Sequence, residues 1–366
     1  MDTNRHPPAD IRRRHGIGRV LACLLALVVA QAAAAKEDSP KPAKLFSTDE
    51  TLAVTLTAPW RELQRNEEYQ GAYPARIEYS DETGNTVELE LTVERRGIKR
   101  QEACKFPPIR LRFEKQAVKG TTFRGEKSLK MVTHCEKSKR FDQYYILEML
   151  AYRMYSLLTD YSFRVRPLEV TYLDSESGKP QPSRFAFLIE DDSDVAKRNG
   201  LKKLKTPKIV ADRLEPEVSS LFSLFQYMIG NVDWAATAGP DPEECCHNVK
   251  LIAPRPLGPN DYIVPLPYDF DSAGLVDAPY AAPPDALPIR SVTQRLFRGY
   301  CVHDGTLESA RQRFLERESA MRALIGAEDR LTSSSKKGAD RYLEQFFDTL
   351  KNAGDFDKYV REKCRK

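Results

Sequence analysis

Long apolar runs are rare in this 366-residue chain. After residue 35 no segment approaches the roughly 18 consecutive apolar residues of a transmembrane helix, so we expect no membrane span in that part. Histidine is also scarce, and only His134, His247 and His303 follow residue 35. The patterns His-Glu-x-x-His and Gly-x-Ser-x-Gly are both missing, which argues against a zinc peptidase and a nucleophile-elbow hydrolase.

An excess of basic residues is missing as well. The chain has 57 Lys and Arg against 53 Asp and Glu, and residues 1–35 contain five Arg and two Asp, which leaves 52 against 51. A nearly neutral chain lacks the basic surface on which nonspecific nucleic-acid binding depends. We therefore expect no nucleic-acid partner, while the oligomeric state stays open.

Residues 1–35 have the pattern of an export signal. Arginines at 12–14 and at 19 precede a short apolar run, 20–30, and small residues follow it. Such a basic segment, short apolar run and small-residue stretch are typical of a cleaved secretory signal peptide. We therefore expect the mature protein to be periplasmic or secreted.

The cysteines agree with an oxidising compartment. Of seven cysteines, Cys23 lies in the apolar run, which leaves six, an even number. Cys104 precedes one predicted strand and Cys135 follows another, so we favour a disulfide between them. Spacing does not settle the pairing of the others, Cys245, Cys246, Cys301 and Cys364.

Alternating apolar and polar residues predict an antiparallel sheet in the first half of the chain. The clearest strand is 87–94, where apolar residues occupy the odd positions. Six more strands are predicted at 52–57, 75–79, 109–113, 128–132, 165–172 and 184–190. A helix at 141–158 shows the spacing of a buried stripe. Residues 36–190 are thus predicted to form a β-rich lobe with one long helix.

The second half of the chain is predicted to be mainly helical. An apolar helix at 213–229 ends at Gly230, and charged helices follow at 307–324 and 340–352. We therefore expect an α+β protein, with residues 191–366 as a mainly helical lobe.

Three side chains after the apolar helix indicate phosphoryl transfer. Asp233, Asn248 and Asp269 follow one another, each at the edge of an apolar run. In phosphoryl transfer the protein aligns the acceptor hydroxyl and neutralises phosphate charge with metal ions and a lysine. Asp233 would orient the hydroxyl, and Asn248 and Asp269 would bind Mg²⁺ through oxygen atoms. Asp271 is a rival or second metal ligand.

Several segments resemble an exported bacterial branch of the CotH-like atypical kinases. They are residues 95–97, 104–108, 129–135, 230–234, 247–248 and 268–271. The resemblance covers roughly residues 50–325, and the last motif alone is also similar to aminoglycoside phosphotransferases and HipA-type kinases. It implies a two-lobed protein-kinase-like fold, ATP with Mg²⁺ or Mn²⁺, and transfer of the γ-phosphate to a hydroxyl, including Ser or Thr of an exported protein.

The resemblance also implies roles for individual residues. It assigns Asp233 to the catalytic base, with Asn248 and Asp269 as metal ligands. Lys130, on a predicted strand, and Glu148, on the predicted helix, would form the ion pair that positions nucleotide phosphates.

The sequence departs from kinase patterns in two respects. No Gly-x-Gly-x-x-Gly loop is present, and instead Arg96 lies among basic residues that could serve as phosphate ligands. Residues 235–246 separate the base from the metal asparagine by more than the usual distance in kinases. The site therefore requires this segment to loop outwards.

Two other functions fit parts of the sequence. A catalytically inactive pseudokinase, or an envelope-associated binding or scaffold protein, would hold partners without turnover, and the scarcity of ATP outside the cytoplasm favours it. A glycosidase needs only two carboxylates, such as Asp269 with Asp271 or Asp233, but nothing in their spacing demands this function.

Overall fold

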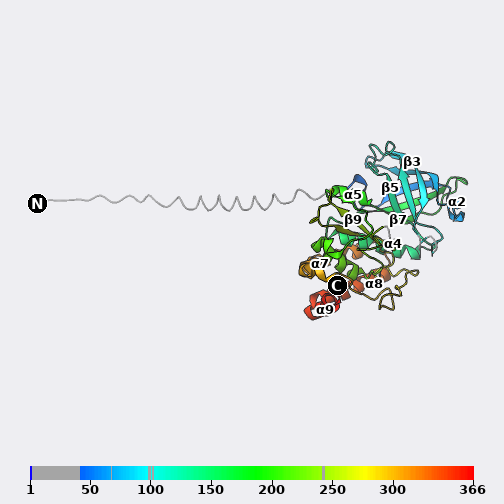
Figure 1. Cartoon of the computed structure of the whole chain (residues 1–366). Coiled ribbons are helices and arrows are strands. Elements are labelled where there is room, and N and C mark those ends of the chain that lie inside the picture. Colours follow the sequence, from blue (N-terminus) through cyan, green and yellow to red (C-terminus); the bar gives the residue numbers. More distant parts are fainter. Residues whose placement is uncertain (2–41, 67, 98–99, 101–102, 241–243) are drawn as a thin grey trace. The chain divides into compact units, whose positions relative to one another are not determined.

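Seven strands in the first half of the chain close into a barrel in the computed structural model (Figure 1). They are β1 (Leu52–Ala58), β2 (Ala72–Ser80), β3 (Thr86–Arg95), β4 (Ile109–Phe113), β5 (Ser128–Val132), β6 (Val165–Asp174) and β7 (Arg184–Ile189). The structure describes residues 1, 42–66, 68–97, 100, 103–240 and 244–366. Apart from Met1, the predicted export signal at 1–35 lies outside the described residues.

The closure of the sheet contradicts the predicted fold class. β1 lies parallel to β6, with Leu52 opposite Leu168, and the other neighbouring strands are antiparallel. The prediction of a two-lobed, protein-kinase-like α+β fold with an open antiparallel sheet is wrong, because the chain forms a closed mixed barrel and a helical C-terminal region. Alternation shows which face a residue occupies, but it does not show which distant strand lies beside it.

Apolar side chains fill the barrel. Leu129 and Met131 of β5 and Leu188 of β7 belong to one buried cluster inside it. The short helix α2 (Trp60–Arg65) adds Trp60, whose indole N–H donates to the Leu56 carbonyl at 3.0 Å.

Helix α4 (Asp142–Ser156) connects the barrel to the helical region. Phe185, Phe187 and Ile189 of β7 share a buried cluster with this helix, whereas the residues between them face the barrel interior. The same cluster includes residues of α6 (Pro216–Ile229), α7 (Asp304–Gly326) and α8 (Ser333–Lys351). Helix α4 lies between the barrel strands and helices α7 and α8 (Figure 1).

A small antiparallel sheet and short helices complete the described chain. The sheet contains β8 (Lys202–Lys203), β9 (Val249–Ala253) and β10 (Val264–Pro267), in the order β10-β9-β8. The sequence patterns did not predict this sheet, because β8 and β10 have only two and four residues and Leu251, Ile252 and Ala253 of β9 form a continuous apolar run without alternation. The other elements are α5 (Asp192–Arg198), α9 (Ala353–Tyr359) and 3-10 helices at Lys44–Phe46, Lys139–Phe141, Ala211–Arg213, Cys301–His303 and Arg361–Lys363. Within the described ranges, no helix combines the length and the apolar character needed to cross a membrane.

Three disulfides occur among the described residues. The bond between Cys104 and Cys135 confirms the favoured pairing. Cys301 bonds to Cys364 near the C-terminus, and the adjacent Cys245 and Cys246 bond to each other.

Candidate functional site

A tight turn after α6 positions Asp233. The helix ends at Gly230, whose φ of 64° lies in the left-handed region. Asn231 is 1% exposed, and its side-chain oxygen accepts the backbone N–H of Asp233 at 3.0 Å. The Trp234 indole N–H donates to the Asn231 carbonyl at 3.1 Å. The backbone is therefore held on both sides of Asp233.

Asp233 and Asn248 are direct neighbours. The Asn248 amide nitrogen donates to the Asp233 carbonyl at 2.8 Å, and Asp233 Oδ1 lies 2.8 Å from His247 Nε2. Ala235 and His247 exchange backbone hydrogen bonds of 2.9 and 3.0 Å, so the intervening segment leaves and returns at one point. Residues 241–243 of this segment lie outside the described residues.

The end of β10 brings Asp269 to the same place. Strands β9 and β10 pair antiparallel, and one step beyond them the Tyr268 backbone N–H donates to the Asn248 carbonyl at 3.1 Å. The backbone N–H of Asp269 donates to the Tyr152 hydroxyl on α4 at 2.9 Å. Asp269 is therefore anchored to both the small sheet and the long helix.

Asn248 and Asp269 share an unusual backbone conformation. Their φ angles are 50° and 64°, and among the described residues only Asp277 is a further non-glycine residue with positive φ. Asn and Asp enter the left-handed region more readily than most residues, but the conformation still has a cost and is concentrated at functional sites. Two of the three predicted metal ligands, Asn248 and Asp269, thus adopt it.

The oxygen atoms here fit a metal ion that is bound together with phosphates. Because Asn248 turns its amide nitrogen towards Asp233, its amide oxygen faces away from that carbonyl. Asp269 is half-buried and supplies a carboxylate. The described residues contain no group of three His, Cys, Asp or Glu that could hold a metal. Mg²⁺ is commonly held by one or two protein oxygens with phosphates and waters, so the residues suit that arrangement.

Three cations surround the Tyr268 ring. Arg96 Nη2 donates to the Tyr268 hydroxyl at 2.6 Å, whereas the Nζ atoms of Lys130 and Lys250 lie 3.9 and 5.8 Å from the ring centre. We call Arg96, Lys130, Lys250 and Tyr268 the Tyr268 cluster. Burial, followed by the charges of Arg96 and Lys250, lowers the pKa of Lys130 to about 7.

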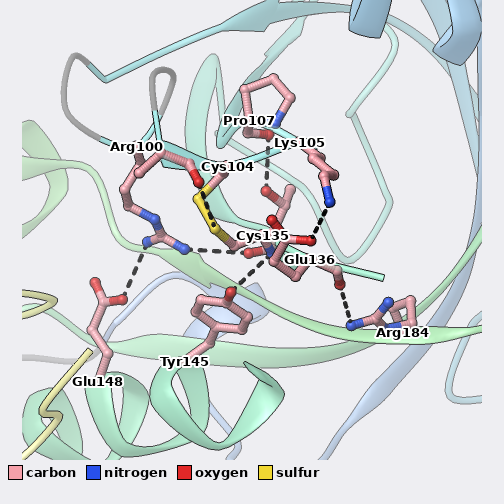
Figure 2. Close-up of a disulfide and its surroundings, with 11 residues drawn as sticks. Arg100, Cys104, Lys105, Pro107, Cys135, Glu136, Tyr145, Glu148 and Arg184 are labelled. Carbon is pink, nitrogen blue, oxygen red and sulfur yellow. Dashed lines mark hydrogen bonds and ion pairs between the residues drawn. A yellow bond between two sulfur atoms is a disulfide. The ribbon is translucent and has the colours of Figure 1, made fainter. Parts of the chain in front are cut away.

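Glu148 pairs with Arg100 instead of Lys130. Arg100 Nη1 lies 3.3 Å from Glu148 Oε2, and both side chains are buried. Figure 2 shows Arg100 extending towards Glu148 on α4, beside the Cys104–Cys135 disulfide. Burial raises the pKa of Glu148 to about 8, although Arg100 opposes this shift. The structure therefore does not form the expected pair with Lys130.

Asp271 belongs to the buried side of the site. It is 9% exposed, and burial followed by the charge of Asp269 raises the pKa of Asp271 to about 6. Arg100 acts in the opposite direction. Of the two carboxylates, Asp269 is the more accessible to a ligand.

A cavity of about 1220 Å³ opens elsewhere, between the start of α4, strands β6 and β7, and the start of α8. None of the predicted site residues lines it. Two buried charges in its wall, Asp142 and Arg184, pair with each other at 2.6 Å. The cavity is therefore separate from the candidate site.

The sequence patterns did not reveal the contributions of Arg100, Tyr268 and Lys250. Lys250 had a usable signal, because it is a cation only two residues after the predicted metal ligand Asn248. Tyr268 had none, since its contacts come from three elements that are distant in the sequence.

A scan against protein-family models finds no match, and neither does a search of curated proteins. The function is therefore argued from the site itself.

Proposed function

We propose that this protein is a metal-dependent phosphotransferase that moves the terminal phosphate of ATP to a hydroxyl group. The convergence of Asp233, Asn248 and Asp269 carries this proposal, because hydrogen bonds link three segments that are distant in the sequence. The resemblance to CotH-like atypical kinases implies the same chemistry. The proposal rests on the local site and not on the two-lobed fold, which the closed barrel rules out.

In this mechanism Asp233 accepts the proton of the acceptor hydroxyl. The hydroxyl oxygen forms a bond to the γ-phosphorus, the bond from that phosphorus to the β–γ bridging oxygen breaks, and ADP leaves with the electron pair. His247, 2.8 Å from the Asp233 carboxylate, keeps that carboxylate in one orientation. Asn248 and Asp269 would hold a divalent ion, Mg²⁺ or Mn²⁺, which would neutralise phosphate charge.

The remaining predicted residues support this arrangement. Arg96 and Lys130 would contact the phosphates of ATP, because both are cations and they meet at Tyr268, the residue before Asp269. Glu148 acts indirectly, because its partner is Arg100. Asp271, buried near the same arginine, is a secondary carboxylate beside Asp269.

We also propose that the protein works in the periplasm or outside the cell. The disulfides Cys104–Cys135 and Cys301–Cys364 support an oxidising compartment. An exported protein with accessible Ser or Thr side chains is the acceptor that such a location favours.

The test is metal-dependent ATP consumption by the purified protein. Because they remove the proton acceptor and a metal ligand, Asp233→Asn and Asp269→Ala should each lower the rate by about 10²–10⁴-fold. Asp277→Ala is a matched control, since Asp277 also has a positive φ but is not a predicted site residue. It should retain nearly the full rate.

Two results would contradict the proposal. One is unchanged turnover in folded Asp233→Asn and Asp269→Ala proteins. The other is a wild-type protein without turnover whose melting temperature rises with Mg-ATP, which would identify a nucleotide-binding protein instead.

A further inference from the structure

We infer that the Tyr268 cluster binds a chain of two or more linked phosphates, with Lys250 and Tyr268 as specificity-determining residues. The inference rests on the proposed function in one respect, because it takes these phosphates to be those of the donor. It assigns two residues and a ligand class that the predicted phosphate contacts, Arg96 and Lys130, do not include.

Like charges accumulate at Tyr268. Arg96, Lys130 and Lys250 come from the segment after β3, from β5 and from β9, and they meet at one tyrosine. Cations close together in a partly buried place repel one another. The face of an aromatic ring attracts a cation by only about 0.5–2 kcal/mol, so the ring does not replace a counter-anion. An anionic ligand would remove the repulsion.

Asp191 and Asp192, the two carboxylates that act on Lys130, have other partners. Asp191 and Asp192 influence Lys130 less than the neighbouring cations do. Asp192 lies 2.5 Å from Lys203 Nζ, and Asp191 accepts the Ser193 backbone N–H at 2.9 Å as the N-cap of α5. These acids therefore do not supply the missing negative charge.

The cations are spread around the tyrosine. Arg96 meets the hydroxyl end of Tyr268, whereas the Nζ atoms of Lys130 and Lys250 lie 3.9 and 5.8 Å from the ring centre. A chain of phosphates carries separate oxygen groups that can reach cations at different positions, which a single phosphate cannot do equally well.

The Tyr268 cluster is continuous with the proposed metal ligands. Lys250 is the second residue of β9, and Asn248 comes directly before that strand. Tyr268 connects the two parts directly, because its backbone N–H donates to the Asn248 carbonyl at 3.1 Å and its hydroxyl accepts from Arg96 at 2.6 Å. A phosphate chain over Lys250 therefore leads towards the proposed metal position.

Calorimetric titration of the full-length protein with inorganic tripolyphosphate, pyrophosphate and orthophosphate, without ATP or divalent metal, tests the inference. Tripolyphosphate should bind at least about tenfold more tightly than orthophosphate, because it forms more charge-assisted contacts. Lys250→Met should weaken tripolyphosphate binding by about tenfold. Lys202→Met, an exposed lysine of the same small sheet, is the matched control and should change it less than about twofold.

Tyr268→Phe tests the tyrosine without removing its ring. It should weaken tripolyphosphate binding severalfold, because Arg96 loses its hydroxyl partner. Equal affinities for tripolyphosphate and orthophosphate would overturn the inference, and so would equal losses in Lys250→Met and Lys202→Met.

The outcomes also separate this inference from the proposed function. Lys250-dependent tripolyphosphate binding in a protein that does not consume ATP would support the inference and contradict the phosphotransferase. If the Lys250→Met variant consumes ATP with an unchanged KM for ATP, the result would support the proposed phosphotransferase activity and contradict the inference.

Discussion

Helix α6 ends at Gly230, and helix α8 packs close to this residue through Tyr342. The φ of Gly230 is 64°, and a Cβ atom built at this position would collide with the Tyr342 hydroxyl. Glycine satisfies both conditions, because it has no Cβ and enters the left-handed region without steric cost. The turn that carries Asp233 begins immediately after it.

We predict that Gly230→Ala lowers the free energy of unfolding by about 1–3 kcal/mol, since it adds both backbone strain and a collision. Gly338→Ala is the matched control, because it lies within α8 with open space around its Cα. It should be neutral or stabilise by up to about 1 kcal/mol. Urea denaturation measures both changes, and equal midpoints for the two variants would contradict the prediction.

Lys130 should give the protein a pH-dependent anion affinity. Burial is the first cause that lowers its pKa, from 10.5 to about 7. Between these values the folded protein holds fewer protons than the unfolded chain, so stability from this residue rises with pH across that window. Anion binding has the opposite trend, because only the protonated amine attracts phosphate strongly.

We therefore predict that the ratio of tripolyphosphate affinities, wild type over Lys130→Met, falls as the pH rises from about 6 to about 8.5. Because the titration of tripolyphosphate itself affects both proteins equally, it cancels in this ratio. Calorimetric titrations across this range measure it. A ratio that stays constant would show that Lys130 does not titrate near neutral pH.

At the scale of elements, the C-terminal tail supports the turn at Asp233. Arg298 donates to the carbonyls on either side of it, those of Val232 and of Trp234, the latter at 2.9 Å. Arg365 donates to the Arg298 carbonyl at 2.7 Å. Arg298 therefore holds the turn of the proposed catalytic residue directly, and Arg365, more than a hundred residues from Asp233 in the sequence, holds Arg298.

The disulfide between Cys301 and Cys364 lies beside both arginines in the sequence. We predict that replacing both cysteines by serine lowers the stability by about 2–4 kcal/mol, because the bond closes a long loop. The rate of ATP consumption should also fall. The Cys245→Ser/Cys246→Ser double variant is the control, since adjacent cysteines close almost no loop. Denaturation and rate measurements that do not distinguish the two double variants would contradict this account.

Across the whole molecule, α4 and the strand beside it unite the barrel with the helical region. Leu150 of α4 belongs to the same buried cluster as Phe187 of β7 and Phe346 of α8. Separating the two regions would expose this cluster to water, and each buried large side chain contributes roughly 1.5–3 kcal/mol. Independent unfolding of the barrel is thus unfavourable.

The two tryptophans allow this to be tested, because Trp60 belongs to the barrel cluster and Trp234 lies beside the candidate site. We predict that Trp60→Phe and Trp234→Phe each show one unfolding transition, in which fluorescence of the remaining tryptophan coincides with far-UV circular dichroism. Midpoints that differ between these two signals would show that the regions unfold separately.

Local periodicity and chain order could be predicted from the sequence. Residues 87–94 alternate as a strand must, and the structure has β3 there. The predicted helix at 141–158 corresponds to α4, Asp142–Ser156. Cys104 and Cys135 also pair as favoured. Each of these predictions depends on local pattern, composition or the position of a residue relative to a nearby element.

Only the tertiary structure showed which strands pair and which side chains contact one another. The sequence alone did not predict that β1 lies beside β6, that Glu148 meets Arg100, or that Lys250 approaches Tyr268. A strand exposes the same backbone groups to every candidate neighbour, and an acid attracts every nearby cation. The side chains that compete for each contact are known only when the distant segments have packed together.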